Sequence, residues 1–173
     1  MIIPIIDLAQ ALTPSSAHIS DVVEKLRAAA TSSGFFYVKN HGISSALIQR
    51  QFDLAAKIFA LPLATKLKYD QSLNDSHLGF EQLAAQKSDY SAKPDIKEGF
   101  YCAKNYPTDH PYVLAKYQGY GINQWPSAEV PEMEQFCQEY IAQLNGLAQR
   151  IMQLLALSLS LDESYFDDCC IDP

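Results

Sequence analysis

The sequence predicts an α+β protein in which helices dominate and a few short strands lack partners within the chain. Apolar residues recur at helical spacing over three long segments, which is typical of amphipathic helices. The β-rich segments, in contrast, are short, far apart and joined by no hairpin signal. A stable sheet generally needs three or more paired strands. We therefore expect edge strands of a sheet whose body lies beyond Pro173 or in another molecule.

Size and composition limit the class of protein further. A chain of 173 residues allows one ordinary domain, so we expect residues 1–173 to form a single region. With 48% hydrophobic and 19% charged residues, the chain is neither disordered nor fibrous. Thirteen Lys and Arg against twenty Asp and Glu give a net charge of −7, opposite to the charge of a typical nucleic-acid binder. No apolar segment is long enough to span a membrane.

The cysteines and the N-terminus indicate a cytoplasmic protein with reduced thiols. The cysteines show no disulfide-framework spacing, and Cys169 and Cys170 are adjacent, a poor geometry for bridging each other. The first residues lack a basic region, and Pro4 interrupts an apolar run that is too short for a secretory signal.

The first elements are a strand and a helix. Ile2 to Leu8 is β-rich, and Pro4 fits a strand entry or an edge. Ser20 is the predicted N-cap of a helix that Gly34 ends as the C′ residue. Its expected apolar face comprises Val22, Val23, Leu26, Ala29 and Ala30.

A second strand and a second helix follow. The run from Phe35 to Val38 is aromatic and β-branched, and the turn signal Asn40-His41-Gly42 closes it. Ser44 or Ser45 then caps a helix that ends near Leu61-Pro62. Its helically spaced apolar residues are Leu47, Ile48, Phe52, Ala55, Ile58 and Phe59.

The second half combines irregular segments with one long helix. Residues 69–95 are predicted to be a long loop, and residues 97–103 a third strand. From Met133 to about Ser160 the pattern predicts a helix of roughly 42 Å. Beyond Leu144 its apolar side exceeds half the circumference, so we expect cover from several directions. Asp162 is expected to cap a last short turn.

The residues alone indicate no catalytic centre. None of the four histidines belongs to a His-x-Asp or His-x-Glu pair, and HExxH, CxxC, nucleophile-elbow and phosphate-loop motifs are absent. Asp109-His110 is interpreted as a solvated loop, and His41 as part of a tight turn. Cys169-Cys170 fits small buried hydrophobes better than a redox or metal pair. One hypothesis, besides the two given at the end of this section, is a metalloenzyme that uses His77 or His110.

The segment Lys97 to Ala103 is the remaining candidate for ligand contact. Strand alternation places Phe100 and Cys102 on one face and Tyr101 and Ala103 on the other. One of these faces could line a cavity beside the 69–95 loop. The alternative is that both faces belong to the core of a sheet.

Several short segments, in this order, resemble the N-terminal half of isopenicillin N synthase-like oxygenases, which are non-haem Fe(II) enzymes and mostly 2-oxoglutarate-dependent. Together they cover nearly the whole chain. The segments are Ile3–Leu8 (IPIIDL), Gly34–Ile43 (GFFYVKNHGI), Phe59–Pro62 (FALP) with Lys66, Asp95–Phe100 (DIKEGF) and Asn123–Pro126 (NQWP).

The resemblance implies a double-stranded β-helix, or jelly-roll, that is preceded by a helical N-terminal region. In that family a His-x-Asp pair and a distal His hold the iron, and an Arg-x-Ser motif binds 2-oxoglutarate. This chain has neither motif, since Arg27, Arg50 and Arg150 are followed two residues later by residues other than Ser. The catalytic core strands are thus expected after residue 173, and we expect neither Fe(II) nor 2-oxoglutarate to bind this chain alone.

The first hypothesis is therefore the N-terminal part of an Fe(II)/2-oxoglutarate-dependent oxidoreductase, a fragment that is inactive by itself. Its expected partners are the missing C-terminal core, or a complementing chain, and a small-molecule substrate, with no nucleic acid and no membrane. By similarity, Phe100, Tyr101 and Cys102 line the substrate pocket. The alternative is a stand-alone, non-catalytic binding or interaction module derived from that family.

Overall fold

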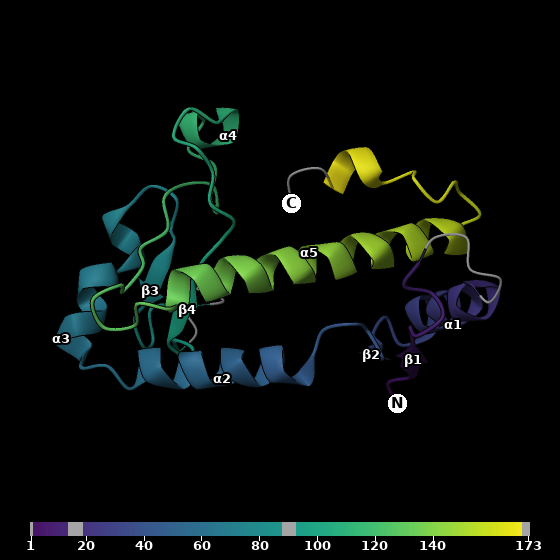
Figure 1. Cartoon of the computed structure of the whole chain (residues 1–173), viewed down its shortest axis with the longest axis horizontal. Helices are drawn as coiled ribbons and strands as arrows, with labels where there is room; N and C mark the ends of the chain where they lie inside the picture. Colours follow the sequence, from purple (N-terminus) through teal and green to yellow (C-terminus); the bar gives the residue numbers. More distant parts are fainter. Residues whose placement is uncertain (1, 14–18, 88–92, 171–173) are drawn as a thin grey trace. The chain divides into compact units, whose positions relative to one another are not determined.

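The computed structural model describes residues 2–13, 19–87 and 93–170. The chain divides into two compact units, residues 1–45 with 143–173, and residues 46–142 (Figure 1). The prediction of a single region stays a prediction. The elements are β1 (Ile5–Asp7), α1 (Ile19–Ser32), β2 (Tyr37–Lys39), α2 (Ser45–Phe59), α3 (Leu63–Lys66), the 3-10 helices η1 (Leu67–Tyr69) and η2 (Gln71–Leu73), β3 (Gly79–Glu81), β4 (Gly99–Tyr101), α4 (Pro111–Leu114), α5 (Met133–Ser158) and the 3-10 helix η3 (Asp167–Cys170).

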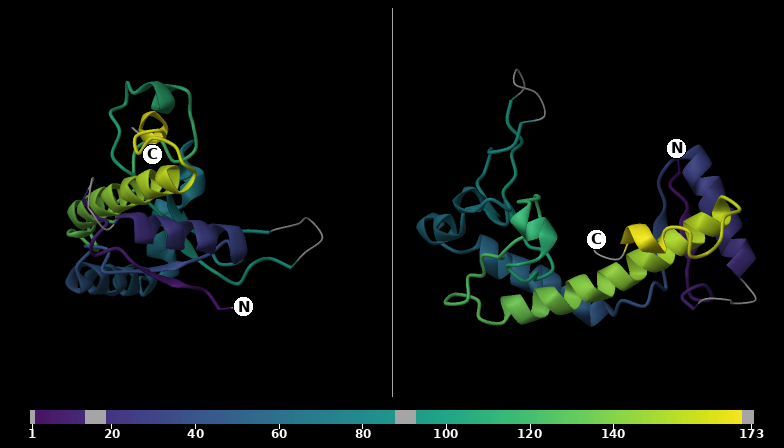
Figure 2. Two further views of the ribbon diagram at one scale, coloured as in Figure 1. Left: turned by 90° about the vertical axis from the view of Figure 1, so that its right-hand side faces the viewer. Right: turned by 90° about the horizontal axis from the view of Figure 1, so that it is seen from above.

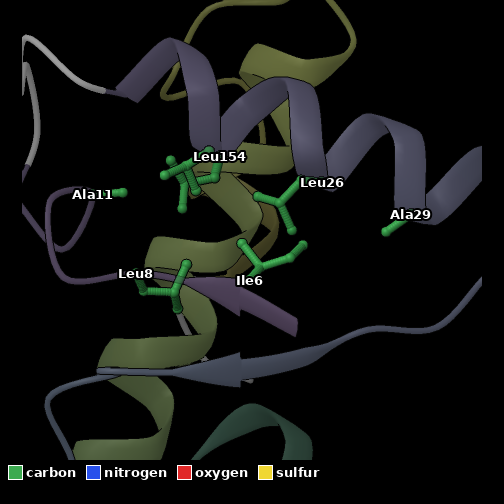
Figure 3. Packing of buried hydrophobic residues seen from close by; sticks show 7 residues of the cluster. Ile6, Leu8, Ala11, Leu26, Ala29 and Leu154 are labelled. Carbon is green, nitrogen blue, oxygen red and sulfur yellow. The ribbon is translucent and has the colours of Figure 1, made fainter. Parts of the chain in front are cut away.

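In the first unit, β1 and β2 form a parallel pair with Ile6 opposite Val38. Helix α1 packs on the pair, and Figure 3 shows Leu26 of α1, Ile6 of β1 and Leu154 of α5 pointing toward one another. These three side chains are at most 1% exposed. The apolar face of a short helix is thus buried against strands that are too short to form a core by themselves.

The predicted end of α1 agrees with the structure, whereas β1, at Ile5–Asp7, is shorter than the predicted strand from Ile2 to Leu8. Gly34 has φ +72° and its N–H donates to Ala29 O at 3.0 Å, which confirms it as the C′ residue. The helix begins at Ile19, one residue before the predicted cap, Ser20. Pro4 lies at the strand entry as predicted, since its carbonyl accepts from Tyr37 N at 2.9 Å.

The apolar faces of the two helices were predicted less well than their positions. In α1, Val22, Leu26 and Ala29 are buried, but Ala30 is exposed. In α2, Phe52 is 67% exposed, whereas Leu54, which was not among the predicted residues, is 3% exposed. The spacing alone allows more than one buried stripe on a helix, and packing decides which one is used.

A buried arginine joins the chain after β1 to the chain after α5. Arg150 is 6% exposed; its Nε donates to Ala11 O at 2.5 Å and it forms an ion pair with Glu163. A second guanidinium donor reaches Thr13 O at 3.2 Å. Two segments far apart in sequence are therefore held by one side chain, which satisfies carbonyls that would otherwise lack partners.

In the second unit, residues 69–95 are not a continuous loop, which corrects the prediction. They contain the end of η1, all of η2 and β3, and β3 pairs with β4 in antiparallel fashion with Phe80 opposite Phe100. The pairing continues as Ala84 N donates to Lys97 O at 3.2 Å, and Figure 2 shows the two segments running side by side. The predicted third strand is confirmed at its centre, as β4.

Strand β3 was missed because it is only three residues long and begins with a glycine. Gly79 has φ +124°, and a Cβ there would lie 2.3 Å from Tyr69 O. Only glycine fits this close backbone approach. A conformation that depends on a contact ten residues away leaves no periodic signal in the sequence.

The long helix α5 is confirmed to within two residues of its predicted C-terminus. The part of the helix that is buried without interruption begins later than expected. Every residue from Arg150 to Ser158 is buried or half-buried, whereas Leu144 is 38% exposed. After the helix, Tyr165 N donates to Asp162 O at 3.0 Å in the expected turn. Within the ranges described above, no helix combines the length and the apolar character needed to cross a membrane.

Candidate functional site

Strand β4 presents different chemistry on its two faces. Phe100 and Cys102 face a cavity of about 60 Å³, whose other walls include Leu54 and Ile58 of α2 and Met133 of α5. Tyr101 points the other way and is 41% exposed. The predicted alternation is thus observed, and the alternative in which both faces are buried core does not hold for Tyr101.

Beside Tyr101 lies an open groove of about 490 Å³. Several of its lining side chains can donate or accept hydrogen bonds. These polar residues are Gln71, Ser76, His77, Glu81, Tyr101 and Gln118. The groove can accordingly bind a small polar molecule by hydrogen bonds rather than by apolar burial alone.

The central charge of the groove is the carboxylate of Glu81, a residue that is only 8% exposed. The Tyr101 hydroxyl donates to it at 3.0 Å and the Gln71 amide at 3.4 Å. Lys97 Nζ lies 3.8 Å away. These donors and the nearby cation stabilise a buried carboxylate, which would be costly to bury alone. Because Gly99 has no side chain, it leaves room for the Tyr101 ring; a Cβ at Gly99 would lie 3.2 Å from that ring.

A second groove, of about 370 Å³, lies on the other side of His77. Its buried carboxylate is Asp70, which accepts from Ser72 N at 2.9 Å and from Gln82 Nε2 at 2.7 Å. Burial raises the pKa of Asp70, but the hydrogen bonds from Ser72 and Gln82 outweigh it, so the pKa is lowered overall.

His77 borders both grooves and has a left-handed backbone, with φ +56°. Asn74 holds this conformation: its Oδ1 accepts from Leu78 N at 3.3 Å and its Nδ2 donates to Leu78 O at 2.7 Å. The sequence predicted only a long loop for this region, which did not indicate that His77 would be presented between two grooves.

A buried lysine positions the start of β4. Lys66 is 8% exposed; its Nζ bonds Glu98 at 2.6 Å and Phe59 O at 3.2 Å. The ammonium also lies 5.1 Å from the centre of the Phe80 ring. The Lys66 ammonium thus holds the end of α2 and the start of β4 together, through a carboxylate, a backbone carbonyl and an aromatic ring.

The side chains of Asn123 and Gln124 bind backbone groups near the C-terminal end of β4 and near β3. Asn123 accepts from Ala103 N at 2.9 Å and donates to Ala103 O at 2.9 Å. Gln124 donates to Asp70 O at 3.0 Å and to Leu78 O at 3.1 Å. These two side-chain amides therefore supply hydrogen bonds to backbone groups at positions where the regular hydrogen bonds of the β3–β4 pair end.

The other histidines singled out in the sequence have local roles. His41 Nδ1 accepts from Ile43 N at 3.2 Å in the predicted turn. His110 is half-buried, which corrects its assignment to a solvated loop: it accepts from Tyr112 N at 3.3 Å and packs 4.9 Å from the Tyr106 ring. Cys169 is exposed and Cys170 half-buried, so the expected burial of that pair is wrong.

Neither groove gathers a set of metal ligands. Within residues 2–13, 19–87 and 93–170, no group of three or more His, Cys, Asp or Glu side chains is placed to hold a metal ion. The side chains of these segments do not fit an iron site.

Comparison with known proteins shows which family this chain matches. Residues 3–128 match the family described as non-haem dioxygenase in morphine synthesis N-terminal. The chain belongs to this dioxygenase N-terminal family. It is 35% identical over 167 residues to the 2-oxoglutarate-Fe(II) type oxidoreductase hxnY of Emericella nidulans, and 33% identical over 178 residues to a clavatol oxidase of Penicillium crustosum. The predicted resemblance is confirmed.

These relatives are longer than this dioxygenase N-terminal region. The alignments cover 95% and 96% of the chain but only 48% and 53% of the two relatives. The chain thus spans about half the length of the curated relatives it matches.

Solved structures agree on the fold. A putative 2OG-Fe(II) oxygenase family protein of Caulobacter crescentus matches with a TM-score of 0.78 at 21% identity, over 95% of this chain and 51% of that one. A full-length Neurospora crassa protein, solved in complex with alpha-KG, matches with a TM-score of 0.76 at 23% identity, over 96% and 50%. The units of this dioxygenase N-terminal region are therefore part of a known oxygenase fold.

Proposed function

We propose that this chain is the N-terminal part of an Fe(II)/2-oxoglutarate-dependent oxygenase and supplies one wall of the pocket for a small organic substrate. The observation that carries the proposal is the polar groove beside β4, where Glu81, Tyr101 and Gln71 form a hydrogen-bonded network. The family membership and the half-length match to 2-oxoglutarate-Fe(II) oxidoreductases support it.

In this proposal the chain orients the substrate and does not carry the oxidation. Tyr101 and Gln71 already donate to Glu81, so a substrate donor can approach only the lone pairs that remain on this carboxylate. Phe100 and Cys102 shape the apolar side of the strand. The groove thus favours a molecule with one hydrogen-bonding end and a compact body.

The iron ligands and the 2-oxoglutarate site then belong to the C-terminal core or to a complementing chain. Since the described residues do not fit an iron site, no step of the oxidation is assigned to them. An apolar face of the β1–β2 pair fits packing against further parts of the oxygenase, because the opposed residues Ile5 and Tyr37 are 64% and 61% exposed.

Consumption of 2-oxoglutarate tests this proposal. The chain is purified alone and together with the polypeptide encoded directly downstream of Pro173, and each sample receives Fe(II) and 2-oxoglutarate. We expect consumption only in the combined sample. Steady consumption by the 173-residue chain alone would overturn the proposal.

A second measurement separates the proposal from a non-catalytic interaction module. An isolated N-terminal part should bind a dye specific for exposed apolar surface, and should stop binding it once the downstream polypeptide is added. A monodisperse chain that unfolds cooperatively and leaves such a dye unbound would favour the module.

A further inference from the structure

Two thiols of the second unit lie on the wall of the same small cavity. Cys102 follows β4 directly, and Cys137 lies in the second turn of α5. Together with Phe100 and Met133 they line the cavity of about 60 Å³ described above. The two thiols are separated by 35 positions in the sequence and come together because the segment after β4 lies beside the start of α5, where Gln138 Nε2 donates to Ala103 O at 2.9 Å.

The two thiols on this cavity wall also affect each other's protonation. The Cys102 thiol donates a hydrogen bond to the sulfur of Cys137, which with burial raises the pKa of Cys102. The same hydrogen bond lowers the pKa of Cys137. Cys102 thus keeps its proton while Cys137 releases its own more readily, and the thiolate so formed on Cys137 is the nucleophilic form of cysteine.

A small oxidant has room to reach both sulfur atoms. Cys137 is 5% exposed, but it shares the cavity with Cys102, which is half-buried and also lines the open groove of about 490 Å³. Since a water molecule occupies roughly 30 Å³ of liquid, a cavity of this size suits a molecule such as hydrogen peroxide. A nucleophilic cysteine beside a second thiol is the arrangement of an attacked and a resolving cysteine.

We propose that Cys102 and Cys137 form a reversible oxidation site, at which a small peroxide converts the thiol pair into a disulfide between β4 and α5. This inference does not depend on the proposed oxygenase function. The thiolate of Cys137 attacks hydrogen peroxide, becomes a sulfenic acid and releases hydroxide, which takes up the proton that Cys137 had lost. The sulfur of Cys102 then attacks the sulfenic sulfur and displaces its hydroxyl group, which leaves with the Cys102 proton as water. The products are one disulfide and two water molecules.

The disulfide would change the properties of the proposed substrate wall. It joins the residue after Tyr101 covalently to α5, so the strand that carries Tyr101 loses freedom to move relative to that helix. It also removes the thiol of Cys102 from the groove. A dithiol reductant reverses both effects.

Peptide mapping of the full chain tests the inference. The folded protein is treated with a few equivalents of hydrogen peroxide, alkylated and digested with trypsin. Cleavage after Lys and Arg places Cys102 in the peptide 98–104, Cys137 in 117–150, and Cys169 with Cys170 in 151–173. We expect the peptides 98–104 and 117–150 to appear cross-linked, and dithiothreitol to separate them.

The same map contains its own internal comparison. The exposed Cys169 reports general oxidation, since it lies in a separate peptide. Oxidation of 151–173 without the 98–104 to 117–150 cross-link would overturn the inference. So would cross-links that join 151–173 to either of the other two peptides in preference.

Matched variants keep the inference falsifiable if one substitution disturbs folding. Cys137→Ser should abolish the cross-link and leave Cys102 open to alkylation, while Cys169→Ser should leave the cross-link unchanged. In Cys102→Ser the sulfenic acid on Cys137 has no resolving thiol, so dimedone should label the peptide 117–150. A persistent intramolecular cross-link to 98–104 in folded Cys137→Ser would contradict the proposed pairing.

Discussion

Replacement of Lys66 by methionine tests whether burial, rather than distance, decides the strength of an ion pair. Lys66 and Lys116 each bond a carboxylate at 2.6 Å, Glu98 and Asp75 respectively. The Lys66 side chain is 9% exposed, whereas those of Lys116 and Asp75 are both 70% exposed. Lys66→Met keeps the unbranched apolar stem of the side chain, so the loss reports mainly the ammonium group.

The expected magnitude follows from what the substitution leaves behind. Glu98 keeps its charge without a partner, and Phe59 O loses its donor. Removal of one partner from a buried pair costs about 3–5 kcal/mol. The Glu98 side chain is 29% exposed and regains some water, so we expect about 2–3 kcal/mol.

Urea denaturation measures the difference. At a slope of about 2 kcal/mol per molar urea, Lys66→Met should lower the midpoint by about 1–1.5 M. The matched control Lys116→Met should leave the midpoint unchanged, because both members of the Lys116–Asp75 pair are exposed to solvent. Adding Glu98→Gln to Lys66→Met should restore part of the loss. Equal midpoints for the two single variants would refute the reasoning.

Three further predictions concern other parts of the two units. Gly79→Ala should remove hydrogen-exchange protection from β3, since a Cβ would lie 2.3 Å from Tyr69 O; unchanged protection would contradict the close approach. Arg150→Met should destabilise the first unit by about 3 kcal/mol in urea, because Glu163 and two carbonyls lose their donor. The pKa of Asp70 is lowered by folding from 3.8, so its contribution to stability is present above that pH and is lost as the pH falls through the folded pKa. Asp70→Asn should therefore flatten the decline in stability below about pH 4, measured by denaturation at successive pH values.

The helices were predictable because their signal is local and repeated. The pattern that begins at Met133 continues over many turns, and the structure ends that helix at Ser158, close to the predicted end. Gly34 was recognised as a helix end for a similar reason, since its left-handed conformation is a property of that residue type. Which stripe is buried was less predictable, as the exposed Phe52 shows.

The site was predictable only in part. The sequence singled out residues 100–102 and their alternating faces. In the structure Phe100 and Cys102 line one cavity and Tyr101 lines the open groove, which Cys102 also borders. The partners of Tyr101 were not predicted, since Glu81 lies in a strand that was taken for a loop. Lys66, which belongs to one of the motifs that carry the family resemblance, bonds Glu98 at the start of β4.

By itself, then, the amino-acid order determined where the three long helices lie, that Gly34 ends the first of them, and which family the chain resembles, because each of these depends on neighbouring residues. Tertiary structure alone decided that Lys66 meets Glu98, that Tyr101 meets Glu81, and that two thiols distant in sequence line one cavity. Such contacts arise from the packing of elements far apart in sequence. Burial then makes each of them strong, since hydrogen bonds and charges compete poorly with water until water is excluded.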